Sequence, residues 1–199
     1  KMIDHDKWLK AQAAERRYHT MAFDLGYQAY SESYSQYFEL LGLDFDCRQK
    51  MILEIGPADY PALTYCKNYN FGFIIEPMPS SILDSLVGRD QFRLELCRQP
   101  AEDIDWDDLW FDEAWLFNVL QHVKDPGVII TKCMEVSERI CFFEPINCGI
   151  SDCHLHSFDM DYFRRYFGDY VRHYPENPKA VNFHTHECAY GVWQKGSEG

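Results

Sequence analysis

The sequence has no long apolar run and no Cys-x-x-Cys pair. No stretch approaches the roughly 20 consecutive apolar residues that cross a bilayer, and the first residues, Lys1 to Asp6, are polar and charged. The eight cysteines follow no disulfide or metal-binding spacing, and several lie within apolar runs, which indicates buried, reduced thiols. These absences predict a cytoplasmic chain that does not enter a membrane.

Positive charge is also scarce. The chain has 19 Lys and Arg against 32 Asp and Glu, so its formal net charge is 19 − 32 = −13. Binding to phosphate backbones or anionic lipid without sequence preference requires a concentrated field of Lys and Arg. The two basic pairs, Arg16/Arg17 and Arg164/Arg165, are short and are interpreted as solvated helix faces. Nucleic acid and membranes are therefore not favoured as partners.

Apolar residues are abundant enough for one sizeable core. The 199 residues are 46% hydrophobic and 16% aromatic, which predicts a single globular domain that needs no disulfide or metal as scaffolding. Upstream of about residue 50 the spacing is helical: Trp8 and Ala11 begin one apolar face, and an aromatic stripe from Tyr30 to Leu41 forms a second. Gly42 is expected to end the second helix.

Downstream of residue 50, short apolar runs alternate with helical segments. Near-continuous apolar strands of this kind suit a parallel sheet covered on both faces. Ser81–Asp84 resembles a capping box, and Asp125-Pro126 places an acid before a proline at a helix start. A helix over 159–167 and strands over 170–174 and 189–194 are expected to close the sheet with an antiparallel edge strand. The expected earlier strands are 51–55, 71–75, 92–96, 114–117 and 140–143.

The most informative stretch is Leu53 to Pro61, where an apolar strand runs into a turn at Gly56 that is expected to lead into a helix. Glu76 follows the next strand, 20 residues after Gly56. In doubly wound folds such a glycine lets the backbone approach a nucleotide, and an acid about 20 residues on accepts its ribose hydroxyls. Glu54 has two open interpretations, a buried acid bonded to backbone amides or a group in the ligand pocket.

These motifs resemble those of the class I S-adenosylmethionine-dependent methyltransferases over roughly residues 50 to 145. Glu54–Pro57 resembles the first motif of that family, and Ile75–Pro77 the second. Ala101–Asp103 resembles the loop that holds the adenine, and Asp112–Pro126 resembles the fourth strand and the segment after it. The resemblance implies an α/β fold: a doubly wound, mostly parallel seven-stranded sheet with an antiparallel edge strand and an N-terminal helical lid.

The resemblance also implies the activity and its site. The cofactor would be S-adenosylmethionine, with S-adenosylhomocysteine as product, and the methyl group would pass by in-line displacement to a small-molecule or sugar acceptor. His122 is the candidate general base; alternatively it packs beside the cofactor or caps a turn. The cofactor-binding residues that the resemblance implies are Glu54, Gly56, Pro57, Ala58, Glu76, Pro77, Ala101, Glu102, Asn118 and Val119.

The single domain is expected to divide into three segments: a helical lid over 1–48, a cofactor-binding core over 49–145, and a substrate-side, sheet-closing segment over 146–199. His154 and His156 in the last segment, and Tyr18 and His19 in the lid, are the predicted substrate contacts. On strands, His154/His156 and the similar pair at 184 and 186 would each offer two imidazoles to a metal. Their spacing matches no zinc signature, so no metal is expected.

The first motif departs from the family at Ala58, Asp59 and Tyr60, where further glycines are usual. A Cβ at Ala58 is unstrained only if φ there is negative. Two other functions stay open: an NAD-dependent oxidoreductase, which would use the same glycine and acid, and a noncatalytic cofactor-binding or adaptor protein. The sequence leaves the acceptor atom and the oligomeric state open.

Overall fold

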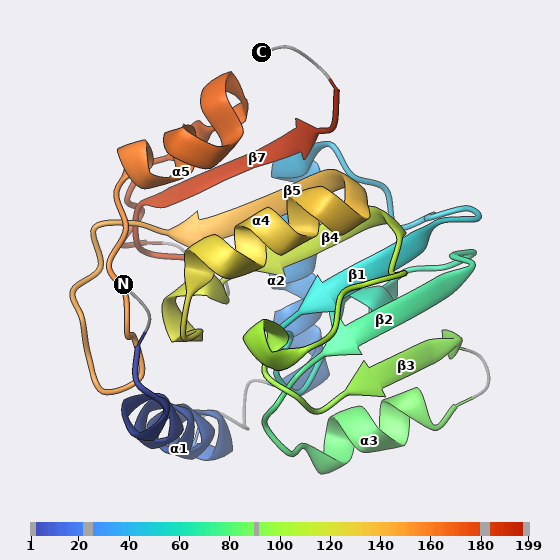
Figure 1. The fold of residues 1–199 in the computed structure, drawn as a ribbon, viewed down its shortest axis with the longest axis horizontal. Coiled ribbons are helices and arrows are strands. Elements are labelled where there is room, and N and C mark those ends of the chain that lie inside the picture. Colours follow the sequence, from blue (N-terminus) through green and yellow to red (C-terminus); the bar gives the residue numbers. More distant parts are fainter. Residues whose placement is uncertain (1–2, 22–25, 90–91, 180–183, 197–199) are drawn as a thin grey trace.

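The computed structural model describes residues 3–21, 26–89, 92–179 and 184–196. Its centre is a seven-stranded sheet in the order β3-β2-β1-β4-β5-β7-β6 (Figure 1). The strands from β3 to β5 in that order are parallel, and β7 runs antiparallel to both β5 and the outermost strand β6. The strands are β1 (Met51–Ile55), β2 (Phe71–Ile75), β3 (Leu94–Cys97), β4 (Phe111–Phe117), β5 (Ser137–Pro145), β6 (Arg172–Tyr174) and β7 (Cys188–Gln194).

Helices cover both faces of this sheet. On one face α4 and α5 pack over the strands, α2 lies behind the opposite face, and α1 lies beyond the strand ends (Figure 1). Within the residues that the structure describes, four 3₁₀ turns also occur: η2 (Ala62–Tyr65), η4 (Ala101–Asp103), η5 (Leu120–His122) and η6 (Gly168–Tyr170). The α-helices are α1 (His5–Met21), α2 (Gly26–Leu41), α3 (Ser81–Val87), α4 (Pro126–Val136) and α5 (Met160–Phe167).

Alternation along the central strands divides the core into two layers. Ala114 and Leu116 of β4 pack in the cluster that includes α4 and α5, whereas Trp115 and Phe117 pack in the cluster that includes α2. Successive strand side chains point to opposite faces, so a strand that is buried throughout must be apolar at almost every position. This arrangement explains the near-continuous apolar runs of the sequence.

Most of the predicted elements are present, with one cap displaced. Asp125 caps α4 by accepting hydrogen bonds from the amides of Gly127 and Val128, and Gly42 follows α2 with a φ of 64°. The N-cap of α3 is Ser80, whose hydroxyl accepts from the Leu83 amide, one residue before the predicted capping box. The predicted capping residue, Ser81, was therefore wrong by one position.

The helix expected after the Gly56 turn was wrong, because only the 3₁₀ turn η2 lies between β1 and β2. Pro57 and Pro61 bias the residues before them away from helical angles, and Pro61 itself has an extended ψ of 140°. The Glu54 carboxylate then accepts hydrogen bonds from the amides of Ala62 and Leu63 at 2.7 and 3.0 Å. These contacts start a tight turn in place of a helix.

Two general features bear on the environment of the protein. None of the helices in the described segments combines the length and apolar character needed to cross a membrane. The eight cysteines, all within the described residues, carry free thiols, and five of them are buried. Burial raises the pKa of the Cys133 and Cys141 thiols above their usual range, which keeps them protonated and unreactive.

Candidate functional site

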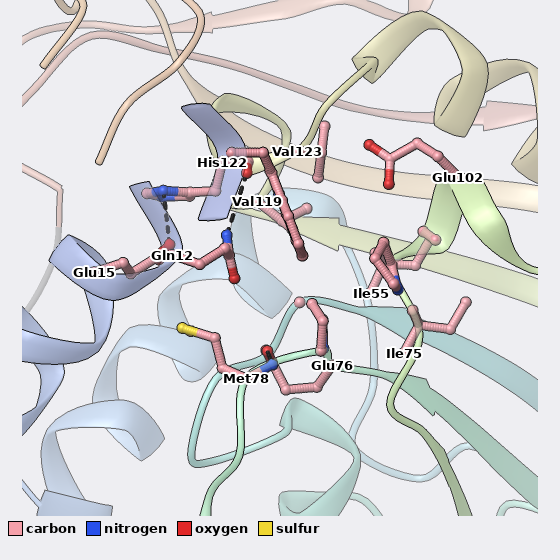
Figure 2. A pocket seen from close by; sticks show the side chains of 15 residues that line it. Gln12, Glu15, Ile55, Ile75, Glu76, Met78, Glu102, Val119, His122 and Val123 are labelled. Carbon is pink, nitrogen blue, oxygen red and sulfur yellow. Dashed lines mark hydrogen bonds and ion pairs between the residues drawn. The ribbon is translucent and has the colours of Figure 1, made fainter. Parts of the chain in front are cut away.

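A cleft of about 440 Å³ opens at the carboxyl ends of the parallel strands (Figure 2). Its walls come from the ends of β1 and β2, from η4 and η5, and from one side of α1. In open α/β sheets ligands bind at this edge, beside the point where the strand order reverses. Of the predicted cofactor and catalytic residues, the cleft is lined by Gly56, Glu76, Pro77, Ala101, Glu102, Val119 and His122.

Gly56 forms the floor of the cleft, and the structure requires glycine there. Its φ is 64°, and a Cβ built on it would lie 2.1 Å from Cγ2 of Val119. Its amide donates to the Ile75 carbonyl at 2.8 Å, so the turn bends toward the end of β2. A side chain at this position would both strain the backbone and fill the space beside η5.

Ala58 stands two residues further on, with a φ of 55°. The left-handed region costs an alanine roughly 1–2 kcal/mol, so the condition for an unstrained Ala58 is not met. The amide of Ala58 donates to the Glu76 carboxylate at 2.9 Å. The hydrogen bond to Glu76, the predicted ribose acid, therefore stabilises the strained backbone of Ala58. Ala58 and Pro57 do not line the cleft themselves.

Glu76 is a buried carboxylate, with only 2% of its surface exposed, and not a solvated group at a strand end. Its two oxygens accept hydrogen bonds from the amides of Ala58 and Met78 at 2.9 and 2.8 Å. Burial raises the pKa of Glu76 to about 7, against the lowering effect of these two bonds. Each carboxylate oxygen keeps a second lone pair, so Glu76 still has capacity to accept hydroxyl groups.

Glu54 lies on the opposite layer from the cleft. It is also buried, its oxygens accept from two amides of η2, and burial raises its pKa to about 7. It does not line the cleft. Of the two interpretations left open by the sequence, the structure has the buried acid bonded to backbone amides.

A third buried acid, Glu144 at the end of β5, was not predicted. It is fully buried and accepts hydrogen bonds from the amides of Val119 and Leu120 at 2.9 and 3.2 Å. Burial raises the pKa of Glu144 to about 8. The bonds fix the start of η5, which carries His122 into the cleft wall. A lone acid at the end of an apolar strand, as at Glu54, is the sequence signal that identifies it.

Because burial raises the pKa of Glu144, we expect the free energy of unfolding to fall as the pH rises. Its pKa is 4.5 in a free chain and about 8 when folded, so between those values the folded protein holds a proton that the unfolded chain has lost. The stabilisation is complete below pH 4.5 and is lost as the pH passes about 8. From about pH 5 to 8 we expect the unfolding free energy to fall by more than about 1.4 kcal/mol, the equivalent of one pKa unit.

Urea denaturation of the wild type and Glu144→Gln across this pH range measures the effect. Glutamine keeps an oxygen equivalent to Oε1, which accepts from both amides, but it does not titrate. The variant should therefore show a shallower fall than the wild type. Glu54 and Glu76 titrate in both proteins, so they do not affect the difference. Identical slopes would contradict this account of Glu144.

His122 ends η5 and is held on both sides of its ring. Nδ1 lies 3.0 Å from the Cys153 carbonyl oxygen and 3.0 Å from a carboxylate oxygen of Glu15 in α1 (Figure 2). Both partners accept, so in the neutral ring Nδ1 carries the proton. Nε2 then accepts from the Gln121 side-chain amide at 3.1 Å. That amide also donates to Asn118, which has a φ of 57° and lies outside the cleft lining.

The turn η4, which the resemblance places beside the adenine, is tied to the segment after η5. Glu102 lines the cleft and accepts hydrogen bonds from the amides of Lys124 and Asp125 at 2.5 and 3.0 Å. The Lys124 ammonium pairs with Asp103 at 2.6 Å. These contacts hold η4 against the start of α4.

Of the predicted substrate contacts, the structure describes the side chains of His154 and His156, and these two point to different partners. The His154 ring lies 5.0 Å from the His122 ring, whereas Nε2 of His156 donates to the Val123 carbonyl at 2.8 Å. His184 contacts the Tyr37 hydroxyl at 2.6 Å on the layer that includes α2. Both histidine pairs lie outside strands, and in the described part of the chain no three His, Cys, Asp or Glu side chains could hold a metal. The side chains of Tyr18 and His19 lie outside the described residues.

The cleft has a distinct electrostatic character. Glu15, Glu76 and Glu102 line it, and within the described residues no Lys or Arg does. A pocket with this lining favours a ligand that carries positive charge and disfavours a polyanion. The side chains that line the rest of the cleft are mainly apolar, as is usual for small-molecule sites.

Comparison with known proteins gives structural matches only. No family model matches the sequence, and no curated protein matches it. A Burkholderia thailandensis 1,6-didemethyltoxoflavin-N1-methyltransferase, solved with that compound and S-adenosylhomocysteine, matches with a TM-score of 0.68 at 13% identity, covering 98% of this chain and 94% of that one. The N-methyltransferase NodS from Bradyrhizobium japonicum WM9, solved with S-adenosylhomocysteine, matches with a TM-score of 0.62 at 11% identity, covering 88% and 92%.

A third match is a Haloferax volcanii chain solved in complex with the methyltransferase activator Trm112, with a TM-score of 0.59, 11% identity, and coverage of 98% and 100%. The chain thus has the Rossmann-like fold of the class I S-adenosylmethionine-dependent methyltransferases. This confirms the predicted fold class and, at the level of fold, the resemblance seen in the sequence.

Proposed function

We propose that this protein transfers a methyl group from S-adenosylmethionine to a small-molecule acceptor. The observation that carries the proposal is the convergence of the Gly56 turn and the Glu76 carboxylate on one cleft. Gly56 lets the backbone approach the ligand, and Glu76 supplies buried acceptors for the ribose hydroxyls. The S-adenosylhomocysteine-bound proteins of the same fold support this choice of cofactor.

The cleft suits this cofactor in charge. The sulfonium and ammonium groups of S-adenosylmethionine are cations, and the cleft presents three glutamates and, among its described residues, no basic side chain. Once bound, the cofactor would supply the electrophilic methyl group.

The protein has little further chemistry to perform. Alignment of an acceptor with the methyl group contributes most of such accelerations, up to about 7–11 kcal/mol in favourable cases. His122 stands at the cleft wall with its proton on Nδ1, so Nε2 is the nitrogen with which it would accept a proton from the acceptor. To do so, Nε2 must exchange the Gln121 amide for the acceptor. A small molecule or a sugar is the acceptor class we favour.

The NAD-dependent oxidoreductase is less well supported than the methyltransferase. A pyrophosphate binds at the N-terminus of the helix that follows the glycine turn. Here that helix is replaced by the four-residue turn η2, and the two amides at its start are already bonded to Glu54. The acidic lining also opposes a dianion. A noncatalytic cofactor-binding protein would have the same cleft. A methyl-transfer assay distinguishes it from a methyltransferase.

Thermal unfolding with added ligands tests the proposal. A ligand at 100 times its Kd stabilises the folded state by about 2.7 kcal/mol, which raises the Tm of a chain of this size by about 5–10 °C. We expect this rise with S-adenosylmethionine and S-adenosylhomocysteine and none with NAD. A rise with NAD alone would favour the oxidoreductase, and no rise with any of the three would reject the proposed cofactor.

A further inference from the structure

The N-terminal helix crosses the open side of the cleft and is fastened there by a small set of contacts. Trp8, Gln12 and Glu15, on one side of α1, line the cleft together with η5. Figure 2 shows Glu15 and Gln12 reaching from α1 to His122. The contacts of this helix with the rest of the protein therefore determine whether the cleft is covered.

Two of these contacts lie at the N-terminal end of α1. Trp8 and Ala11 pack on Leu155, and the Lys124 ammonium lies 5.3 Å from the centre of the Trp8 ring. Among the described residues this apolar contact is small: its buried members are Trp8, Ala11 and Leu155, with Ile3 packed against them. Further along the helix the described contacts are polar: the Gln12 amide donates to the His122 carbonyl at 3.4 Å, and a carboxylate oxygen of Glu15 lies 3.0 Å from His122 Nδ1.

The ion-pair geometry at Glu15 differs from that of a surface pair. The side chains of His122 and Glu15 are only 11% and 12% exposed, so the 3.0 Å contact between them is largely shielded from water. Nδ1 shares its proton with the Cys153 carbonyl, so one ring atom joins α1, η5 and the 151–156 segment. A bond that joins three segments opposes the lifting of α1 away from the cleft.

We propose that Glu15 is a positioning residue that, through Nδ1 of His122, holds α1 across the cleft and leaves Nε2 as the proton-accepting nitrogen. The two nitrogens of His122 then have separate tasks. Nδ1 fastens the lid, and Nε2 faces the reaction once an acceptor displaces the Gln121 amide. The second task rests on the proposed function, whereas the first does not.

Paired substitutions separate these tasks. Asparagine at 122 places an N–H donor near the position of Nδ1, whereas glutamine places it near Nε2. Glu15→Gln keeps an oxygen acceptor, and Glu15→Ala removes it. We expect hydrogen exchange of the α1 amides over residues 8–15 to speed up at least about tenfold in Glu15→Ala and His122→Gln, the change expected from losing one largely buried contact with a charged group. Glu15→Gln and His122→Asn should stay close to the wild type.

Two controls guard against general destabilisation. Glu39→Ala removes an exposed glutamate from α2 and should leave α1 exchange unchanged. The amides of β4 and β5 are an internal reference, because a globally destabilised variant would speed their exchange as well.

In the wild type, nitrogen-15 spectra of the His122 ring should show the proton on Nδ1.

The outcomes are distinct. Selective loosening of α1 in Glu15→Ala and His122→Gln, with recovery in the conservative variants, supports the proposal. Unchanged exchange in Glu15→Ala, equal loosening in all four variants, or a proton on Nε2 of ligand-free His122 overturns it. The exchange experiment needs no cofactor, so it tests the role of Glu15 even if the protein does not bind S-adenosylhomocysteine. A failure to bind that ligand would reject the proposed function alone.

Discussion

Replacing Glu76 with alanine is expected to weaken the binding of S-adenosylmethionine by more than about tenfold. Two ribose hydroxyls that donate to one carboxylate would form charge-assisted hydrogen bonds worth roughly 1.5–3 kcal/mol each. The substitution also releases the amides of Ala58 and Met78, so the loop beside the ligand loses its anchor. Both effects act in the same direction, which is why the expected loss exceeds that of a typical surface contact.

Isothermal titration calorimetry measures this loss directly, with far-UV circular dichroism as the check on folding. Glu95→Ala is the matched control, because Glu95 is an exposed glutamate on the neighbouring strand β3 and does not line the cleft. Glu76→Gln keeps one oxygen for a backbone amide and should bind with intermediate affinity. Equal affinity in Glu76→Ala and the wild type would reject the ribose assignment.

The Gly56→Ala variant is expected to lose about 2–5 kcal/mol of folding stability and to lose detectable cofactor binding. About 1–2 kcal/mol comes from an alanine with positive φ, and about 1–3 kcal/mol comes from overpacking. The overpacking arises because the new Cβ would lie 2.1 Å from Val119 Cγ2. Relief of that contact would move the start of η5, which Glu144 holds in place.

Gly42→Ala separates the two causes. Gly42 has the same φ of 64°, but a Cβ there meets nothing within 4 Å, so this variant should show the conformational cost alone. Adding Val119→Ala to Gly56→Ala should recover part of the stability by removing the clash. Urea denaturation of the four proteins gives the comparison. If Gly56→Ala and Gly42→Ala lose equal stability, the close approach to Val119 has no energetic weight.

The sequence was most informative where structure is set by local patterns. Near-continuous apolar runs predict buried parallel strands, and β1 and β2 begin and end at the predicted residues. Asp125-Pro126 predicts the start of α4 because a cap needs only neighbouring amides. The 20-residue spacing from Gly56 to Glu76 predicts their convergence because two adjacent parallel strands end at the same edge.

The sequence was least informative where a side chain acts on a distant segment. Glu144 of β5 accepts from the amide of Val119, which follows the neighbouring strand β4 and lies 25 residues away in the sequence. Nothing near Glu144 in the sequence indicates that partner. Glu15 belongs to a helix with a weak apolar pattern, so its contact with His122 becomes visible only once α1 is placed over η5. The missing helix after Gly56 shows the same limit, since the Glu54 bonds that favour η2 reach eight and nine residues along the chain.

The central claim is that the turn at Gly56 and the Glu76 carboxylate hold the same nucleoside. A crystal structure of the protein grown with saturating S-adenosylhomocysteine tests it most directly. We expect both ribose hydroxyls within hydrogen-bond distance of Glu76, the adenine beside the Ala101–Asp103 turn, and the sulfur next to the Gly56 backbone. A ligand bound elsewhere, or a ribose that makes no contact with Glu76, would contradict the account.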